Sequence, residues 1–335
     1  MTSSTETINL GVIGAGWIGT FHAETVAQRI PGARLLAVAD PVPGAAEQLA
    51  EKYGALAYTD TADLLANPDV HGVVIASPAF THTETVIAAA EAGKAIFVEK
   101  PMALTLEDAD RAIEAAKTAG VPLQVGFNRR YSTDFARAGE YVHDGKIGTP
   151  QLLRSLTRDP GLAHPERVKP WTIFYETLIH DFDTLNWINK DARPTEVFAV
   201  ADALVAPEYK DGGLLDTAVV TIRYDNGAIA TAEANFSAAY GYDVRGEYFG
   251  SAGMVTAGDP ATISTRYYSV EGVAADTSRL NIDLFHQAYT DELIDFVAAI
   301  RTGEVKGARG EDAKAALAIA LACIQSCENN APVAL

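Results

Sequence analysis

Residues 8–19 read INLGVIGAGWIG, and this stretch decides the fold of the chain. An apolar run leads directly into Gly14, Gly16 and Gly19, in the spacing G-x-G-x-x-G, and residues 17–30 are compatible with a helix. In a strand–turn–helix unit the first glycine permits a tight turn, the second lets a pyrophosphate approach the backbone, and the third lets helix and strand pack closely. The N–H groups at the start of the helix also suit a phosphate. The stretch therefore predicts a dinucleotide-binding turn.

The second apolar run, residues 35–39, ends at Asp40. An acid at this point accepts hydrogen bonds from the 2′-hydroxyl of an adenosine ribose and repels a 2′-phosphate. Residues 41–43, PVP, offer no arginine to neutralise such a phosphate. We therefore predict NAD rather than NADP, against the simpler interpretation that Asp40 only forms a turn at the strand end.

Composition sets the broad class of the protein. With 335 residues, 48% of them hydrophobic, the chain can form two globular domains. A formal net charge of −18 disfavours nucleic acid and anionic membranes as partners. We see no secretory signal, and the longest apolar stretch, near residues 315–324, is too short to span a bilayer. Cytoplasm is the default expectation for its location.

Strand and helix patterns alternate over residues 1–125, which predicts a doubly wound α/β (Rossmann) domain with a parallel sheet. Later strands are expected over residues 70–77, 95–98 and 121–127. Ligands of such sheets bind at the carboxyl ends of the strands. The residues at these ends are Gly14, Asp40, Ser77 and Lys100.

Residues 126–335 have a different pattern, which predicts a second domain of α+β type with a mostly antiparallel open sheet. Strands prevail from residue 195 to residue 269, with a hairpin turn at Asp225-Asn226-Gly227. Helices are expected over residues 132–143, 173–188, 285–301 and 311–327, the last two being free to pack back on the first domain. One face of the sheet needs a cover, and we expect another subunit to supply it.

Lys100 is the first candidate for chemistry. It stands at a strand end between Glu99 and Pro101, where a lysine can hydrogen-bond a substrate hydroxyl and favour developing negative charge on its oxygen. The simpler interpretation is a surface lysine. We favour the functional role because the site lies where a nicotinamide is expected.

The expected helix over residues 173–188 carries the second candidate site. Glu176 and His180 are four residues apart and share a face, and Asp183 follows on a related face. The imidazole of His180 can take the proton that an alcohol loses on oxidation, and Glu176 can orient the imidazole or hold a second hydroxyl. A metal site built from these three residues is the less favoured alternative, so no metal is predicted.

Together these motifs resemble the Gfo/Idh/MocA family of sugar and polyol oxidoreductases, and within it inositol 2-dehydrogenases. The matching segments, in order, are GAGWIG at residues 14–19, EKP at 99–101, GFNRRY at 126–131 and ETLIH at 176–180. The resemblance runs over essentially the whole chain. It implies NAD-dependent oxidation of a secondary hydroxyl of a cyclic polyol to the ketone. A pyranose sugar as substrate, and a non-catalytic NAD-binding sensor, are the alternatives.

The resemblance also implies roles for individual positions. Lys100, His180 and Glu176 match the catalytic residues, with Glu176 where an aspartate is usual and Thr157 where a histidine is usual. The expected substrate contacts are Lys100, Arg130, Thr157, Glu176, His180, Tyr242 and Tyr289. The expected cofactor contacts are Gly14, Gly16, Trp17, Ile18, Asp40, Ser77, Pro78, His82, Glu99 and Lys100. The family's enzymes are commonly homotetramers, which sets the expectation for this chain.

Several of these positions have simpler interpretations. Arg130 can pair with one of the many acidic residues, and Tyr242 and Tyr289 can be packing residues. Sequence alone also leaves open whether Lys100 or His180 is the immediate base.

Overall fold

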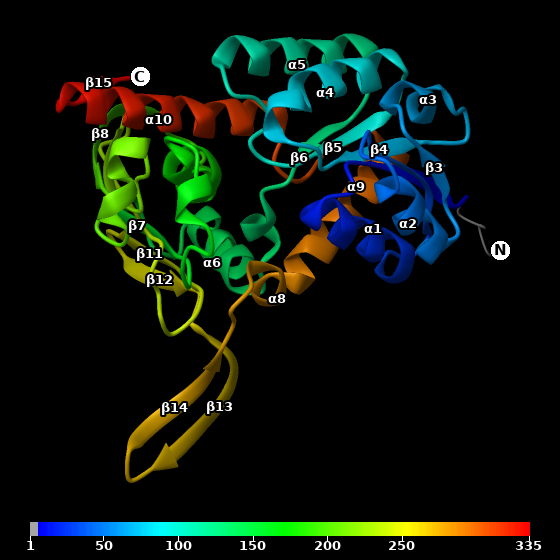
Figure 1. Cartoon of the computed structure of the whole chain (residues 1–335). Helices are drawn as coiled ribbons and strands as arrows, with labels where there is room; N and C mark the ends of the chain where they lie inside the picture. The colour runs from blue at the N-terminus through cyan, green and yellow to red at the C-terminus, as the bar shows by residue number, and fades with distance from the viewer. Residues whose placement is uncertain (1–5) are drawn as a thin grey trace. The chain divides into compact units, whose positions relative to one another are not determined.

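Figure 1 shows the computed structural model of the chain, in which residues 6–335 are described. The chain forms two compact units. One comprises the described residues up to Asn128 together with Gln287–Lys314, and the other comprises Arg129–His286 with Ala315–Leu335. Within residues 6–335, none of the helices combines the length and apolar character that crossing a bilayer requires.

The first unit is built on a six-stranded parallel sheet in the order β3-β2-β1-β4-β5-β6. Its strands are β1 Ile8–Ile13, β2 Ala33–Ala39, β3 Leu56–Tyr58, β4 Gly72–Ile75, β5 Ala95–Val98 and β6 Leu123–Val125. All side chains of β4 and β5 are buried, as expected where helices cover both faces. The strand order reverses between β1 and β4, which is where ligands bind in such sheets. The predicted fold is confirmed.

Helices cover both faces of this sheet (Figure 1). They are α1 Trp17–Arg29, α2 Ala45–Tyr53, α3 Thr61–Ala66, α4 His82–Glu91, α5 Leu106–Ala119 and α9 His286–Thr302. Helix α9 comes from the far end of the sequence. Its Leu293, Phe296 and Val297 share one core cluster with side chains of β1, α1 and α2, such as Leu10 and Val26. The first unit therefore needs a late segment of the chain to complete its core.

The second unit contains a seven-stranded sheet in the order β12-β11-β7-β10-β9-β8-β15. Its strands are β7 Pro150–Arg158, β8 Pro194–Asp202, β9 Thr217–Tyr224, β10 Ile229–Asn235, β11 Asp243–Gly250, β12 Gly253–Ala257 and β15 Val333–Ala334. The β9–β10 hairpin turns at residues 225–227, as predicted. Strand β7 was not expected from the sequence, and it pairs parallel with β10 whereas all other pairs are antiparallel.

One face of this sheet carries helices and the other is open. The helices of the unit are α6 Thr133–His143, α7 Leu178–Ile188, α8 Asn281–Leu284 and most of α10 Gly310–Asn329. On α10, Ser326 Oγ accepts a hydrogen bond from the backbone N–H of Ala199 in β8. On the open face, cross-strand pairing aligns an apolar row whose side chains are 40–58% exposed. The row consists of Met254, Phe249, Leu152 and Ile229.

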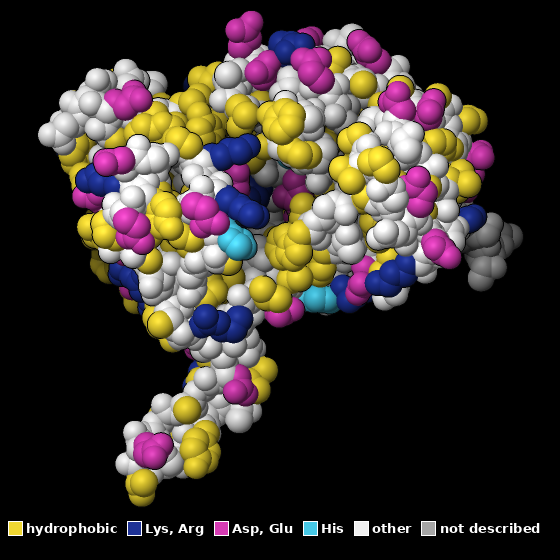
Figure 2. Space-filling view, viewed as in Figure 1, with side chains coloured by type: hydrophobic (Ala, Val, Ile, Leu, Met, Phe, Trp, Pro, Cys, Tyr) yellow, Lys and Arg dark blue, Asp and Glu magenta, His cyan; other side chains and the backbone are white. Residues whose placement is uncertain are grey.

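A two-stranded hairpin extends from the second unit (Figure 1). It consists of β13 Ala261–Ser269 and β14 Gly272–Thr277. Hydrophobic side chains are visible along it in the space-filling view (Figure 2), and Tyr267, Tyr268 and Val273 are each more than half exposed. The hairpin therefore adds apolar surface to the unit without adding to its core.

Candidate functional site

The three glycines of the turn between β1 and α1 differ in the space around them. Gly14 has φ +100°, and a Cβ there would lie 2.7 Å from the carbonyl oxygen of Ala76. A Cβ on Gly19 would lie 1.9 Å from the carbonyl oxygen of Gly14. A Cβ on Gly16, in contrast, would meet no protein atom within 4 Å. The first and third glycines thus serve packing, while the second leaves open space at the start of α1, as a closely approaching ligand requires.

A pocket of about 640 Å³ lies at this turn. Its walls come from the carboxyl ends of β1, β2 and β4 and from the start of α1. The predicted cofactor contacts among its lining residues are Gly14, Gly16, Trp17, Ile18, Asp40, Ser77 and Pro78. The N-terminus of α1 opens into this pocket with no side-chain cap, so its backbone N–H groups remain available to a phosphate.

Asp40 closes the loop that follows β2. Its Oδ2 accepts a hydrogen bond of 2.7 Å from the backbone N–H of Ala15, and its Oδ1 accepts one of 2.8 Å from Val42. Each carboxylate oxygen can accept a second hydrogen bond, so the group can still receive ribose hydroxyls. The open space at Gly16 and the acceptors of Asp40 fit NAD, and the carboxylate opposes a 2′-phosphate.

His82 lies at the start of α4, outside the pocket lining described for residues 6–335. Its ring is buried, with Nδ1 2.8 Å from the carbonyl oxygen of Pro101 and Nε2 2.8 Å from that of Ser77. Burial lowers the pKa of His82, against the opposing effect of the two carbonyls. The ring therefore ties the loop after β4 to the loop after β5, and direct contact with the cofactor stays a prediction.

Lys100 and Glu99 follow β5, and their side chains have different surroundings. Glu99 is buried, with Oε1 2.7 Å from His22 Nε2, while Oε2 accepts a hydrogen bond from the backbone N–H of Lys100. The side chain of Lys100 is half-buried. The carboxylate of Glu99 thus faces the interior of the unit, and contact of Glu99 with the cofactor stays a prediction.

In the second unit, the expected helix over residues 173–188 is not one continuous α-helix. Residues Ile173–Thr177 form a π-helical turn, and the α-helix begins only at Leu178. Trp171, just before this turn, has φ +64°, an uncommon value for a bulky residue. Glu176 therefore lies in the π turn and His180 lies in α7, and their position on a shared face stays a prediction. Such turns often occur at functional sites.

Glu176 is exposed and His180 is half-buried. Asp183, one helical turn beyond His180, is bound by Arg130 through two hydrogen bonds, of 2.9 Å from Nε and 2.6 Å from Nη2. Arg130 and Asp183 thus form a bidentate ion pair within the unit. This use of both side chains is structural, and the predicted substrate contact of Arg130 rests on the resemblance alone.

Thr157 belongs to a buried network beside this pair. Asp181 is fully buried and lies 2.7 Å from Arg129 Nη1, and it also accepts hydrogen bonds from Ser155 and Thr157. Thr157 Oγ1 in turn accepts a hydrogen bond from Arg129. The sequence did not indicate this network, whose members come from the start of the unit, β7 and α7. Substrate contact by Thr157 stays a prediction.

The two tyrosines predicted to contact substrate belong to different units. Tyr242 is half-buried, and burial, reinforced by the charge of Asp159, raises its pKa above the ordinary value. Tyr289 is buried in α9, where its ring makes edge contacts with Phe21 and His22. Packing accounts for the position of Tyr289. Substrate contact by Tyr242 and by Tyr289 stays a prediction.

The parallel sheet, the glycine turn with open space at Gly16, and Asp40 beside it define a dinucleotide-binding protein of Rossmann type. The chain belongs to the Gfo/Idh/MocA family of oxidoreductases. Residues 8–127 match the family described as "Oxidoreductase family, NAD-binding Rossmann fold", and residues 135–256 match the GFO/IDH/MocA C-terminal domain.

Relatives and solved structures agree with this membership. The chain is 37% identical to a myo-inositol 2-dehydrogenase of Thermotoga maritima over 98% of both chains. It is 34% identical to a scyllo-inositol 2-dehydrogenase (NAD(+)) of Bacillus subtilis, covering 98% of this chain and 96% of the relative. The crystal structure of a Lactobacillus casei scyllo-inositol dehydrogenase with NAD(H) and scyllo-inositol has a TM-score of 0.93 at 28% identity, covering 98% and 99%.

Proposed function

We propose that the protein is an NAD-dependent dehydrogenase that oxidises a secondary hydroxyl of an inositol to the ketone. The observation that carries the proposal is the pocket at the glycine turn, with open space at Gly16 and acceptors on Asp40. The full-length similarity to inositol dehydrogenases supports the substrate class. The bound cofactor supplies the acceptor for the hydride that the substrate carbon loses.

Two side chains serve the substrate in this proposal. Lys100, at the carboxyl end of β5, donates a hydrogen bond to the reacting oxygen and stabilises its developing negative charge. His180, in α7, takes the proton of the hydroxyl as a neutral imidazole. Glu176, from the π turn, binds a further hydroxyl of the ring or orients His180. Arg130, Thr157, Tyr242 and Tyr289 are proposed to shape the substrate site.

The test is a substrate panel followed by NADH absorbance. We expect turnover of myo-inositol or scyllo-inositol with NAD, and much slower turnover with NADP. Glucose and methyl glucosides serve as the matched pyranoses. Turnover of a pyranose but of no inositol would overturn the substrate class. Tight binding of NAD without turnover of any polyol or sugar would favour a non-catalytic sensor instead.

We also propose that the protein is a cytoplasmic homotetramer whose copies associate through the open face of the second unit's sheet. The apolar row there places four exposed apolar side chains next to one another, whereas exposed apolar residues that need no explanation are scattered singly. Light scattering should give four times the mass of the chain. Leu152→Glu with Ile229→Glu should lower that mass, and an unchanged tetramer would show that another surface forms the interface.

A further inference from the structure

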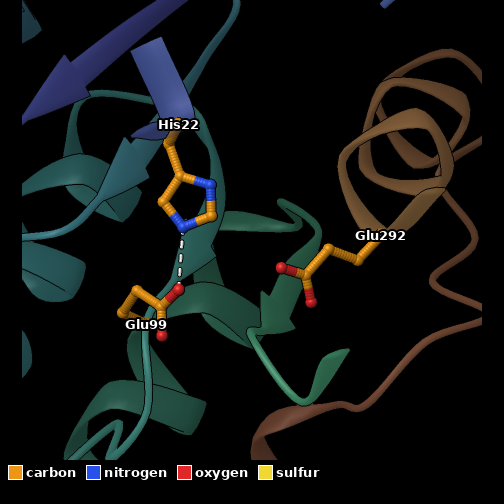
Figure 3. Close-up of side chains that lie close together, drawn as sticks. All are labelled: His22, Glu99 and Glu292. Carbon is orange, nitrogen blue, oxygen red and sulfur yellow. Dashed lines mark hydrogen bonds and ion pairs between the residues drawn. The ribbon is translucent and has the colours of Figure 1, made fainter. Parts of the chain in front are cut away.

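Three ionisable side chains meet inside the first unit (Figure 3). They are His22 from α1, Glu99 from the end of β5 and Glu292 from α9. All three are buried, and one ligand atom from each lies within 4.8 Å of the others. In the described part of the chain this is the one group of histidine and carboxylate side chains so placed.

The two carboxyl groups of the cluster differ in their hydrogen bonds. Glu99 accepts from His22 Nε2 at 2.7 Å and from the backbone N–H of Lys100 at 3.2 Å. Neither carboxyl oxygen of Glu292 has a hydrogen-bond partner among residues 6–335, although the residue is fully buried. The backbone of Glu292 is fixed, because Gln124 Nε2 donates a 2.8 Å hydrogen bond to its carbonyl oxygen. The carboxyl group is thus held in the interior without a donor to stabilise a charge.

Two carboxyl groups this close together in a buried site do not both ionise, because each charge disfavours the other and neither is solvated. Burial alone would raise the pKa of Glu99, but the hydrogen bond from His22 and the charges of His22 and Lys100 outweigh it and leave that pKa below its ordinary value. Burial and then the charge of Glu99 raise the pKa of Glu292 well above its ordinary value. The negative charge therefore belongs on Glu99.

A metal ion is the competing explanation for such a set of groups. Ligands at about 2.0 Å from a tetrahedral zinc ion lie about 3.3 Å from one another. His22 Nε2 and Glu99 Oε1 are 2.7 Å apart, which is a hydrogen-bond distance. The geometry therefore favours a proton over a metal ion.

We propose that Glu292 holds a proton and Glu99 a negative charge, and that the His22–Glu99–Glu292 cluster thereby positions Lys100. Neutral Glu292 leaves the charge of Glu99 to act on its hydrogen-bond partners, His22 and the backbone of Lys100. Glu99 is thus a positioning residue. Its carboxylate is held by His22 of α1 and is hydrogen-bonded to the backbone N–H of Lys100. The second half of this inference rests on the proposed function of Lys100, whereas the protonation of Glu292 does not.

Infrared spectroscopy of the full protein tests the protonation directly. A buried protonated carboxyl gives a C=O stretching band distinct from that of a carboxylate. We expect this band in the wild type at neutral pH, its loss in Glu292→Gln, and its retention in Glu91→Gln, a matched change at an exposed glutamate. Absence of the band in the wild type would overturn the proposal. So would a stoichiometric metal ion, found by elemental analysis, that Glu292→Gln loses.

Steady-state kinetics test the positioning. Glu99→Gln removes the charge but keeps the shape, and we expect kcat to fall about 10²-fold, as for a catalytic group displaced by about 1 Å, while KM for NAD changes less than twofold. Glu99→Asp keeps the charge and should recover part of the loss. Glu292→Gln should lower kcat less than about fivefold, because a neutral group replaces a neutral group.

The two proposals fail in different ways. Full activity of Lys100→Ala would remove the proposed role of Lys100 and leave the infrared result untouched. An inactive Lys100→Ala beside a Glu99→Gln variant with kcat within twofold of the wild type would overturn the positioning alone. If Glu99→Gln does not fold, Glu99→Asp tests the positioning instead. A kcat of Glu99→Asp within twofold of the wild type would show that moving the carboxylate by one methylene has no effect, and would overturn the positioning.

Discussion

The two units use charged side chains in opposite ways. In the first unit, Asp40 stands at a strand end, lines a pocket and keeps acceptor capacity for a ligand. In the second unit, Arg129 and Asp181 are bound to each other in the interior, and Arg130 and Asp183 form a second ion pair beside them. The comparison teaches that charged residues in or next to a family motif can support the fold, as Arg129 and Arg130 do by pairing with Asp181 and Asp183.

The largest expected effect concerns the first unit. Lys100→Ala should lower kcat about 10³-fold, because the developing charge on the substrate oxygen loses its main donor. The affinity for NAD, measured by fluorescence titration, should change less than about threefold, since Lys100 is not in the lining of the cofactor pocket in the described residues. Comparable losses in kcat and NAD affinity would place Lys100 in cofactor binding.

The next effect concerns the buried network of the second unit. Asp181→Ala leaves the guanidinium of Arg129 buried without its counter-charge, which should cost about 3–5 kcal/mol of unfolding free energy. Urea denaturation measures the loss. Glu140→Ala, which breaks an exposed ion pair with Arg137, is the control and should leave the unfolding midpoint unchanged. Equal effects of the two variants would show that the network is not supporting the unit.

A smaller effect is expected at the cofactor pocket. Asp40→Ala should weaken NAD binding about 10-fold to 10²-fold, the magnitude of a hydrogen bond to a charged group. It should also reduce the preference for NAD over NADP, because the repulsion of a 2′-phosphate is lost. The ratio of kcat/KM for the two cofactors reports this. An unchanged ratio would mean that Asp40 only holds the backbone at Ala15 and Val42.

The smallest expected effect is on NAD affinity at Gly16, which faces open space, in contrast to Gly19, which packs against the backbone of Gly14. Gly16→Ala places a methyl group where no protein atom lies, so the folded state should tolerate it while NAD affinity falls about tenfold. Gly19→Ala, in contrast, must move the carbonyl oxygen of Gly14 and should lower the thermal midpoint. Loss of stability in Gly16→Ala with unaltered NAD affinity would reverse the assignment of the two glycines.

The sequence predicted those features that depend on local backbone patterns. The glycine turn, the parallel strands and the hairpin at residues 225–227 follow from short-range spacing, and the structure confirms them. Strand β7 was missed because its partners β10 and β11 come much later in the chain. The π turn was missed because residues 173–177 contain no glycine or proline that would indicate an irregular helix.

The candidate site was predictable only in part, for a related reason. Gly16 and Asp40 act through strand ends, whose positions a parallel sheet fixes. The partners of Arg129, Thr157 and Glu99 depend on side-chain packing between distant segments, which no periodicity encodes. Glu292 is the clearest case, since a lone glutamate in an amphipathic helix normally indicates a solvated face.

The late arrival of α9 has a consequence for protein synthesis. A growing chain makes every strand of the first unit before residue 126, yet the apolar side chains of α9 that complete the core follow only after strands β7 to β12 of the second sheet have been made. The N-terminal sheet thus leaves the ribosome while the core residues that α9 will cover are still exposed. His22 and Glu99 lack the third member of their cluster, Glu292, until α9 is made. Folding of this unit cannot be completed until α9 has been made.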